Sequence, residues 1–335
     1  MSPRLKVALQ YIIILIVTIL LILFSLSGLT VSEEENKWDY IVKTWRIADK
    51  GWLLLMFGFA MMSHIVRTMR WKMLLVPTGN NVTLKNGFLS LMVGYLVNLA
   101  IPRGGEVSRC YNLYKLNAVP VDVSFGTVVV ERVVDLICLF LLVVLAFTLE
   151  SKKLLAFIDT LPLHLSRASS RFSLFFYFAV AGIAGLLILY VLLRRNKKVI
   201  EFLQKIWVGM KSGLLSVFQL EHKGLFIFYS ALIWIFYFFM SFCVIKAFPA
   251  TEHLGFSAVI SLFGIGSIAM AAPLPGGAGS YHVLVPQGLS FLYGIQLKDA
   301  VALTFIFHGW QTFIMIVAGS VSLMVTSFLV RRMTK

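Results

Sequence analysis

The sequence predicts an all-α polytopic membrane protein, with about six full transmembrane helices and two opposed re-entrant helical hairpins. Composition is the first observation behind this. The 335 residues are 59% hydrophobic and 13% charged, whereas a soluble domain carries about 25% charged residues. The second is the mean hydropathy of +0.88. The third is that long apolar runs alternate with charged loops along the chain.

Six apolar runs are near or above the roughly 17–25 residues that cross a bilayer. They lie at about 5–29, 51–69, 120–149, 172–193, 224–248 and 300–328. A cleavable signal peptide is the alternative for the first run. Its apolar region would be about 7–15 residues long and followed by a small-residue cleavage site. We therefore expect a retained first helix.

The charges predict an orientation. Lys and Arg number 30 against 15 Asp and Glu, a net charge of +15. On a soluble chain this excess would suggest nucleic acid, but here its placement follows the positive-inside rule, and we expect no nucleic-acid partner. Both termini and the basic segments 67–85 and 194–223 should be cytoplasmic. The loops 31–50 and 150–171 should lie outside.

Two segments are expected to enter and leave the membrane on the same side. Segment 86–119 has both ends inside and is broken by Pro-Arg-Gly-Gly-Glu at 102–106. Segment 255–297 has both ends outside and is broken by Pro-Leu-Pro-Gly-Gly-Ala-Gly at 273–279. Gly/Pro-broken segments in corresponding positions of two halves point to a midplane binding site in transporters.

The chain therefore reads as one transmembrane domain, 1–335, built from two halves. Residues 51–149 form the first half-repeat, and 224–328 form a second, inverted one. The alternative is two loops that dip into a bundle without any repeat. Between the halves, 199–223 is either an amphipathic interfacial helix on the cytoplasmic leaflet or an ordinary positive-inside loop.

The strongest functional signal is the charged group Glu131, Arg132 and Asp135 inside the span 120–149. Glu131 is about eleven residues into that helix, about 16 Å deep at ~1.5 Å per residue, near the bilayer midplane. A charge there costs on the order of 2.5–3.5 kcal/mol, so such residues face the interior and need partners. The pattern fits an ion-pair brace, or a polar path in which Arg132 binds a lipid phosphate.

The second signal is the broken segment 98–109. Broken backbone at membrane depth is tolerated only where protein buries it or where it lines a cavity. A helix after the break would direct its N–H groups at that cavity, which favours an anion. Arg103 and Arg109 add positive charge, while Asn98 and Glu106 add polar groups that can orient them. The alternative is a cytoplasmic loop with solvated charges.

Two further groups are weaker. Arg67 and Arg70, followed by Trp71, share a helix face and fit headgroup capture at the inner mouth or ordinary stop-transfer charge. The outer break offers candidate contacts where glycine permits close backbone approach. These are Pro275, Gly276, Gly277, Gly279, Ser280 and His282. A lone histidine such as His282 is more often structural.

Catalytic and metal signals are few. Cys110, Cys138 and Cys243 are far apart, with no CxxC, so we expect neither a disulfide framework nor a zinc site. HExxH and GxSxG are also absent from the sequence. We therefore expect no enzyme activity, no cofactor and no metal.

Together the motifs resemble the transmembrane-region family of lysylphosphatidylglycerol synthases, the flippase domain of multiple-peptide-resistance-factor proteins. The resemblance rests on Arg-x-x-Arg-Trp at 67–71, the stretch 98–109, Glu-Arg-x-x-Asp at 131–135 and Pro-x-Pro-Gly-Gly-x-Gly at 273–279. Two features depart from it. His282 stands where family members commonly carry Glu, and the soluble aminoacyl-transferase domain is missing, so this chain should not synthesise the lipid itself.

The resemblance implies translocation of an anionic or aminoacylated phospholipid between leaflets of a bacterial inner membrane. Within it, we expect Arg67, Arg70, Arg103, Arg109 and Arg132 to hold the headgroup, with Asn98, Glu106, Glu131 and Asp135 as a polar network. The expected partners are a phospholipid, the membrane and a lipid-synthesising enzyme. The alternatives are an integral-membrane enzyme acting on a lipid phosphate or glycan, and a scaffold for a lipid or glycan synthase.

Overall fold

The computed structural model describes residues 36–160, 197–272 and 274–333, with several residues between 16 and 26. At 159–160, 197–203 and 205 it describes the backbone only. The predicted span 172–193 and most of the predicted span 5–29 lie outside the described residues. All regular elements in the described ranges are helices.

In chain order the helices follow the predicted apolar runs closely. They are α2 (Lys37–Ile47), α3 (Lys50–Leu75), η1 (Val76–Thr78), α4 (Leu84–Ala100), α5 (Gly104–Asn117), α6 (Val121–Thr160), α8 (Lys197–Leu215), α9 (Lys223–Ala247), α10 (Phe256–Ala271), η3 (Pro275–Gly277), α11 (Ser280–Tyr293) and α12 (Leu297–Met333).

Capping side chains set several helix starts. The Asn36 side chain accepts a hydrogen bond from the backbone N–H of Trp38, and Asp49 accepts one from Gly51 at 2.7 Å. Thr83 caps α4 in the same way. Each cap satisfies an N–H that the first helical turn leaves unpaired. The cap at Asn36 makes 37–47 a helix, where the sequence suggested only a loop.

Three of the described helices, α3, α9 and α12, are long and apolar enough to cross a membrane. They coincide with the predicted spans 51–69, 224–248 and 300–328. The predicted span 120–149 lies within α6, which has 40 residues and a kink at Glu150 (φ −138°, ψ 41°). Beyond the kink α6 continues into the expected outer loop, because Leu154 and Phe157 pack in a buried cluster with Leu292.

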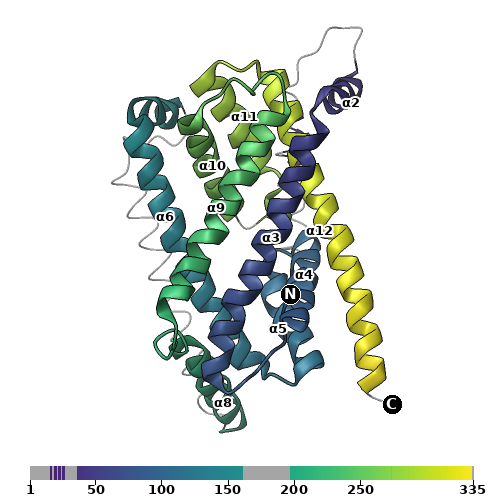
Figure 1. Cartoon of the computed structure of the whole chain (residues 1–335), viewed down its shortest axis with the longest axis vertical. Helices are drawn as coiled ribbons and strands as arrows, with labels where there is room; N and C mark the ends of the chain where they lie inside the picture. The colour runs from purple at the N-terminus through teal and green to yellow at the C-terminus, as the bar shows by residue number, and fades with distance from the viewer. Residues whose placement is uncertain are drawn as a thin grey trace.

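Two shorter helix pairs occupy opposite halves of the molecule (Figure 1). The pair α4–α5 has 17 and 14 residues, and the pair α10–α11 has 16 and 14. Their tips meet: the Arg103 guanidinium donates to the Ala271 carbonyl at 3.1 Å. Thus the two breaks predicted from Pro and Gly lie next to each other, although they are far apart in sequence.

The α4–α5 pair is held together by close backbone approach. A methyl group on Gly105 would lie 2.1 Å from the Gly94 carbonyl oxygen, so the two helices can touch only because this residue has no side chain. The Asn98 side chain accepts a hydrogen bond from the Gly105 N–H at 2.7 Å, which caps α5. The Gly-Gly sequence after Arg103 therefore serves packing as well as the break.

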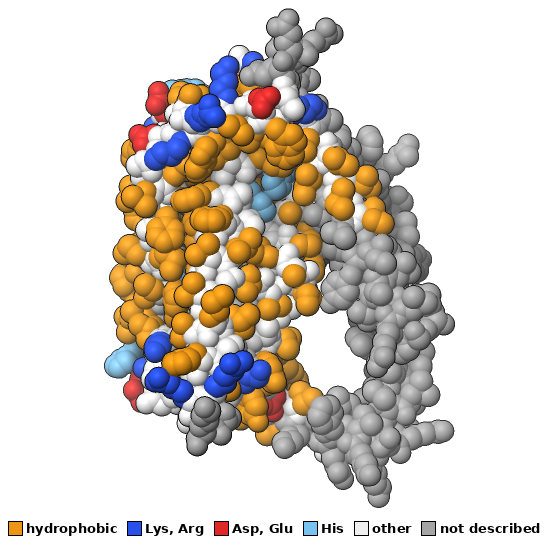
Figure 2. Space-filling model, turned by 90° about the vertical axis from the view of Figure 1, so that its right-hand side faces the viewer, with side chains coloured by type: hydrophobic (Ala, Val, Ile, Leu, Met, Phe, Trp, Pro, Cys, Tyr) orange, Lys and Arg blue, Asp and Glu red, His pale blue; other side chains and the backbone are white. Residues whose placement is uncertain are grey.

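The largest apolar core cluster joins α3, α9, α10, α11 and α12. It includes Met56, Val259, Leu289 and Ala300, which are almost completely buried. On the face shown in Figure 2, hydrophobic side chains cover the middle, and Lys and Arg gather at both ends. That distribution is typical of a surface that faces lipid tails between two polar interfaces.

The linker helix α8 packs along α6 through glycine. A methyl group on Gly213 would lie 2.3 Å from the Val123 carbonyl oxygen, and one on Gly126 would lie 2.3 Å from that of Met210. Trp207 and Val208 on α8 are exposed. Because apolar side chains remain exposed on a lysine-rich helix, α8 has the character of the interfacial helix considered for 199–223.

Candidate functional site

A cluster of seven charged side chains lies between α3, α5 and α6. We call it the ionic cluster; its members are Arg67, Arg70, Glu106, Arg109, Glu131, Arg132 and Asp135. All seven belong to the residues that the sequence predicted as candidate site residues. Helical spacing places each set on one face of its helix, and packing brings the three faces together.

Asp135 lies between the two arginines of α3. Its carboxylate pairs with Arg67 at 3.0 Å and with Arg70 at 2.8 Å. The side chains of Arg67 and Arg70 are 5% and 0% exposed. These arginines are therefore buried ion-pair partners, unlike the solvated charges that usually flank a span.

Glu131 is the most central acid of the cluster. Its carboxylate accepts a hydrogen bond from Arg109 of α5 and lies 3.6 Å from Arg70. The Arg109 guanidinium also lies over the Trp71 ring, 4.1 Å from its centroid. Trp71 in turn donates to Thr127 at 2.9 Å, which fixes the ring. Buried charges are tolerated when they are paired and hydrogen-bonded in this way.

Arg132 forms the accessible edge of the ionic cluster. Its guanidinium pairs with Glu106 at 2.9 Å and lies 3.9 Å from Asp135, the i, i+3 partner on α6. The Arg132 side chain is 38% exposed, whereas those of Arg67, Arg70 and Arg109 are at most 5% exposed. A molecule that approaches the cluster would therefore contact Arg132 first.

Two members of the site come from α9 and were missed from the sequence. Arg67 donates to the Tyr237 hydroxyl at 3.1 Å, and Arg70 donates to Ser230 at 3.3 Å. Both lie in an aromatic, apolar helix that carries no charged motif near them. Only their polar groups in a predicted span could have marked them.

The ionic cluster has unused binding capacity. Four guanidinium groups face three carboxylates, which leaves one net positive charge. The Nε atoms of its four arginines, Glu106 Oε2 and Glu131 Oε1 have no hydrogen-bond partner. Buried polar atoms normally have one, so unpartnered atoms beside an exposed arginine are consistent with a ligand.

Two other predicted residues, Arg103 and Asn98, lie outside the ionic cluster. Arg103 is exposed at the tip of α4–α5, where its backbone adopts a left-handed conformation (φ 62°) that non-glycine residues rarely use. There it contacts α10, as described above. Asn98 caps α5 and does not contact the charged groups.

The outer break forms a separate polar group. Gly276, Gly277 and Gly279 all have positive φ, which glycine adopts without strain. The Gly276 carbonyl bonds to His308 at 3.0 Å, and Ser280 donates to the Ala269 carbonyl at 2.7 Å. Pro275 begins the 3₁₀ turn.

His282 lies beneath this turn and is buried. Its Nδ1 accepts a hydrogen bond from the Gly279 N–H at 3.3 Å, and its ring lies 4.7 Å from that of His308. These contacts tie α11 to α12. The interactions of His282 within the described residues therefore match a structural histidine.

These features define a helical membrane protein with a buried ionic cluster of net positive charge. The sequence profile of the lysylphosphatidylglycerol synthase transmembrane region matches residues 9–319. The chain belongs to this family, which confirms the resemblance found from the motifs and connects the protein with membrane lipids.

A membrane protein of the UPF0104 family from Methanocaldococcus jannaschii is 34% identical to this chain over 100 residues. The aligned segment covers 29% of this chain and 30% of that relative. No solved structure matches the chain.

Proposed function

We propose that this protein is a flippase-like lipid translocase that moves an anionic or aminoacylated phospholipid between leaflets without changing it chemically. Its family connects it with membrane lipids. The observation that carries the proposal is the ionic cluster with its net positive charge and one exposed arginine, Arg132, within an apolar helical molecule.

The proposed chemistry is an exchange of partners at Arg132. A guanidinium binds two phosphate oxygens in one plane, so Arg132 can leave Glu106 and take the headgroup phosphate. Arg67, Arg70 and Arg109 supply positive field behind it, while Glu131 and Asp135 neutralise most of their charge. That balance lets the headgroup bind without being trapped. Arg103, exposed between the two hairpin tips, would meet the headgroup next.

The proposal includes a membrane arrangement. The spans 5–29 and 172–193 with α3, α6, α9 and α12 would give six crossings, with both termini in the cytoplasm of a bacterial cell. The pairs α4–α5 and α10–α11 would be re-entrant from opposite faces, and 51–149 and 224–328 would form the inverted repeat. Helix length supports this, because α4 and α10 have 17 and 16 residues against the ~20 needed to span.

Leaflet exchange in proteoliposomes tests the proposal. Headgroup-labelled phosphatidylglycerol, phosphatidylethanolamine and a polyprenyl phosphate would be offered to the wild type, Arg132→Ala and Arg103→Ala. Arg332→Ala is the control, because Arg332 is exposed at the end of α12, outside the cluster. We expect protein-dependent exchange that falls at least tenfold in Arg132→Ala, a loss of about 1.4 kcal/mol, and is unchanged in Arg332→Ala.

Three other results would count against it. Exchange that survives in both Arg132→Ala and Arg103→Ala would keep transport and discard the proposed site. Lipid recovered with a changed mass would favour an enzyme. Folded protein that exchanges none of the three lipids would favour a scaffold.

A further inference from the structure

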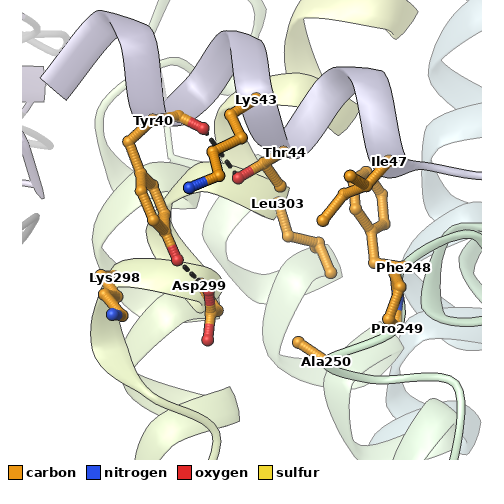
Figure 3. A pocket seen from close by; sticks show the side chains of 10 residues that line it. All are labelled: Tyr40, Lys43, Thr44, Ile47, Phe248, Pro249, Ala250, Lys298, Asp299 and Leu303. Carbon is orange, nitrogen blue, oxygen red and sulfur yellow. Dashed lines mark hydrogen bonds between the residues drawn. The ribbon is translucent and has the colours of Figure 1, made fainter. Parts of the chain in front are cut away.

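A cavity of about 270 Å³ lies at the α2 end of the molecule, between α2, the first turn of α12 and the loop after α9. Its lining is divided by character (Figure 3). Tyr40, Lys43, Lys298 and Asp299 lie toward one end, and Ile47 and Phe248 lie toward the other. Such a cavity fits a ligand with one charged end and one apolar end.

The polar end of the cavity has an excess of positive charge. Lys43 of α2 and Lys298 of α12 supply two ammonium groups, against the single carboxylate of Asp299. Asp299 already accepts a hydrogen bond from the Tyr40 hydroxyl, and Lys298 lies 5.6 Å from the Tyr40 ring centroid. Charge complementarity therefore favours an anionic ligand.

The surroundings of the cavity favour a lipid. Trp38, Val42 and Ile47 are exposed on α2, a helix that also carries Lys43 and Arg46. Exposed apolar side chains on a basic helix with a tryptophan are typical of an element at the membrane interface. In Figure 1, α2 lies at one end of the long helices, where that interface would be.

We propose that this cavity binds the headgroup of an anionic phospholipid, with Lys43 and Lys298 contacting the phosphate and Ile47 and Phe248 contacting the glycerol and upper acyl chain. It is distinct from the ionic cluster. On α3, Arg67 lies about 26 Å from Lys50 at ~1.5 Å per residue, close to the ~30 Å thickness of a bilayer core.

The two sites therefore stand one apolar layer apart. In the translocation proposed above, the cavity is where the headgroup docks at the leaflet opposite the cluster. Binding to the cavity is an equilibrium property, however, and it does not require translocation.

The test is photo-crosslinking of the full chain in phosphatidylcholine nanodiscs. The probe is phosphatidylglycerol with a diazirine near the carboxyl end of one acyl chain, at limiting concentration, and crosslinked residues are mapped by mass spectrometry. We expect crosslinks to Ile47, Phe248 or Leu303. In the double variant Lys43→Gln/Lys298→Gln, they should fall about tenfold, because each lysine near an anionic lipid gives a several-fold increase in affinity.

Two further variants control this result. Arg46→Gln removes one charge from the exposed side of the same helix but does not line the cavity, so its crosslinking should match that of the wild type. Ala250→Trp keeps both lysines and fills the cavity, so it should lose the crosslinks. This second variant keeps the test decisive even if the lysine variant folds poorly.

The proposal is overturned if these crosslinks persist in both Lys43→Gln/Lys298→Gln and Ala250→Trp. It is overturned too if a phosphatidylcholine probe labels the same residues equally, or if glycerol 3-phosphate in solution competes fully, which would indicate a free-phosphate site. Crosslinking that persists in Arg132→Ala, while exchange is lost, would support both proposals. Normal crosslinking without any exchange in the wild type would remove only the translocase.

Discussion

Glu131 shows at the scale of one residue why the ionic cluster has the composition it has. Its side chain is 1% exposed and contacts two arginines from two other helices. The desolvation of a buried ion pair offsets most of its attraction, but removal of one partner leaves the other charge buried and uncompensated. The acids are therefore required because the arginines are there.

We predict that Glu131→Gln destabilises the protein by about 3–5 kcal/mol, because Arg109 loses its ion-pair partner in a buried site. Thermal unfolding in detergent would measure the change. The double variant Glu131→Leu/Arg109→Met removes both charges together and should recover most of the loss. A single variant as stable as the wild type would mean that the pair is already solvated.

Which residues would be charged and buried could be predicted from the sequence, but their partners could not. The i, i+3 spacing places Arg132 and Asp135 together, and the cost of a charge inside a span requires a partner. The pairs between Arg67 and Asp135 and between Arg109 and Glu131 depend instead on how separate helices pack. No local pattern carries that information.

At the scale of helices, the α4–α5 pair depends on one close contact. We predict that Gly105→Ala destabilises the protein by about 1–3 kcal/mol, because the new methyl group would overlap backbone rather than a movable side chain. The control is Gly58→Ala on α3, where a methyl group meets nothing within 4 Å. Gly58→Ala should be neutral or slightly stabilising. Equal effects in the two variants would exclude the proposed packing role.

The kink of α6 is a second element-scale feature. Glu150 accepts hydrogen bonds from Ser257, Ser261, Tyr293 and Lys153, which join the end of α6 to α10 and α11. Burial alone would raise the pKa of Glu150, but these hydrogen bonds outweigh it and hold the pKa below its ordinary value of 4.5. The charged form therefore stabilises the folded state.

The sign of the pH dependence follows from that lowered pKa. The stabilisation by Glu150 is complete above pH 4.5 and is lost as the pH falls toward the folded-state pKa. We predict that Glu150→Gln lowers the melting temperature at neutral pH and that this difference shrinks below pH 4.5. Glu252→Gln, at an exposed position of the same end, is the control. A difference that is constant with pH would contradict the assignment.

The helices themselves were largely predictable, because apolar length and Gly/Pro breaks act locally. The break at 102–106 falls between α4 and α5, and that at 273–279 falls between α10 and α11. Helix 37–47 was missed because its moderate polarity resembled a loop, and the cap at Asn36 was overlooked. The extension of α6 past Glu150 depends on buried contacts of Leu154 and Phe157 that sequence does not reveal.

For the whole molecule, the contact between the hairpin tips is the main constraint on mechanism. Arg103 bonds to Ala271, and a methyl group on Gly276 would lie 3.1 Å from the Leu99 side chain. The two pairs therefore abut rather than pass each other. A headgroup that moves from one half to the other must separate or skirt these tips.

The last prediction concerns how the α4–α5 pair enters the membrane. Single cysteines would be placed at Asn81, Ile101 and Ala118 in a background without Cys110, Cys138 and Cys243. If the pair is re-entrant, an impermeant maleimide should label Asn81→Cys and Ala118→Cys from the cytoplasmic side alone. Ile101→Cys at the tip should stay unlabelled from the opposite side, because two helices this short end within the apolar layer.

The matched control is the outer pair, in which Glu252→Cys and Gln296→Cys should react only from the other side. Labelling of Ile101→Cys from that side would mean that α4 and α5 each cross the membrane. The charged residues of α5 would then lie along a full crossing. The ionic cluster would no longer stand at the end of a blind entry from one leaflet, and the alternating route proposed for the headgroup would have to be replaced by a continuous one.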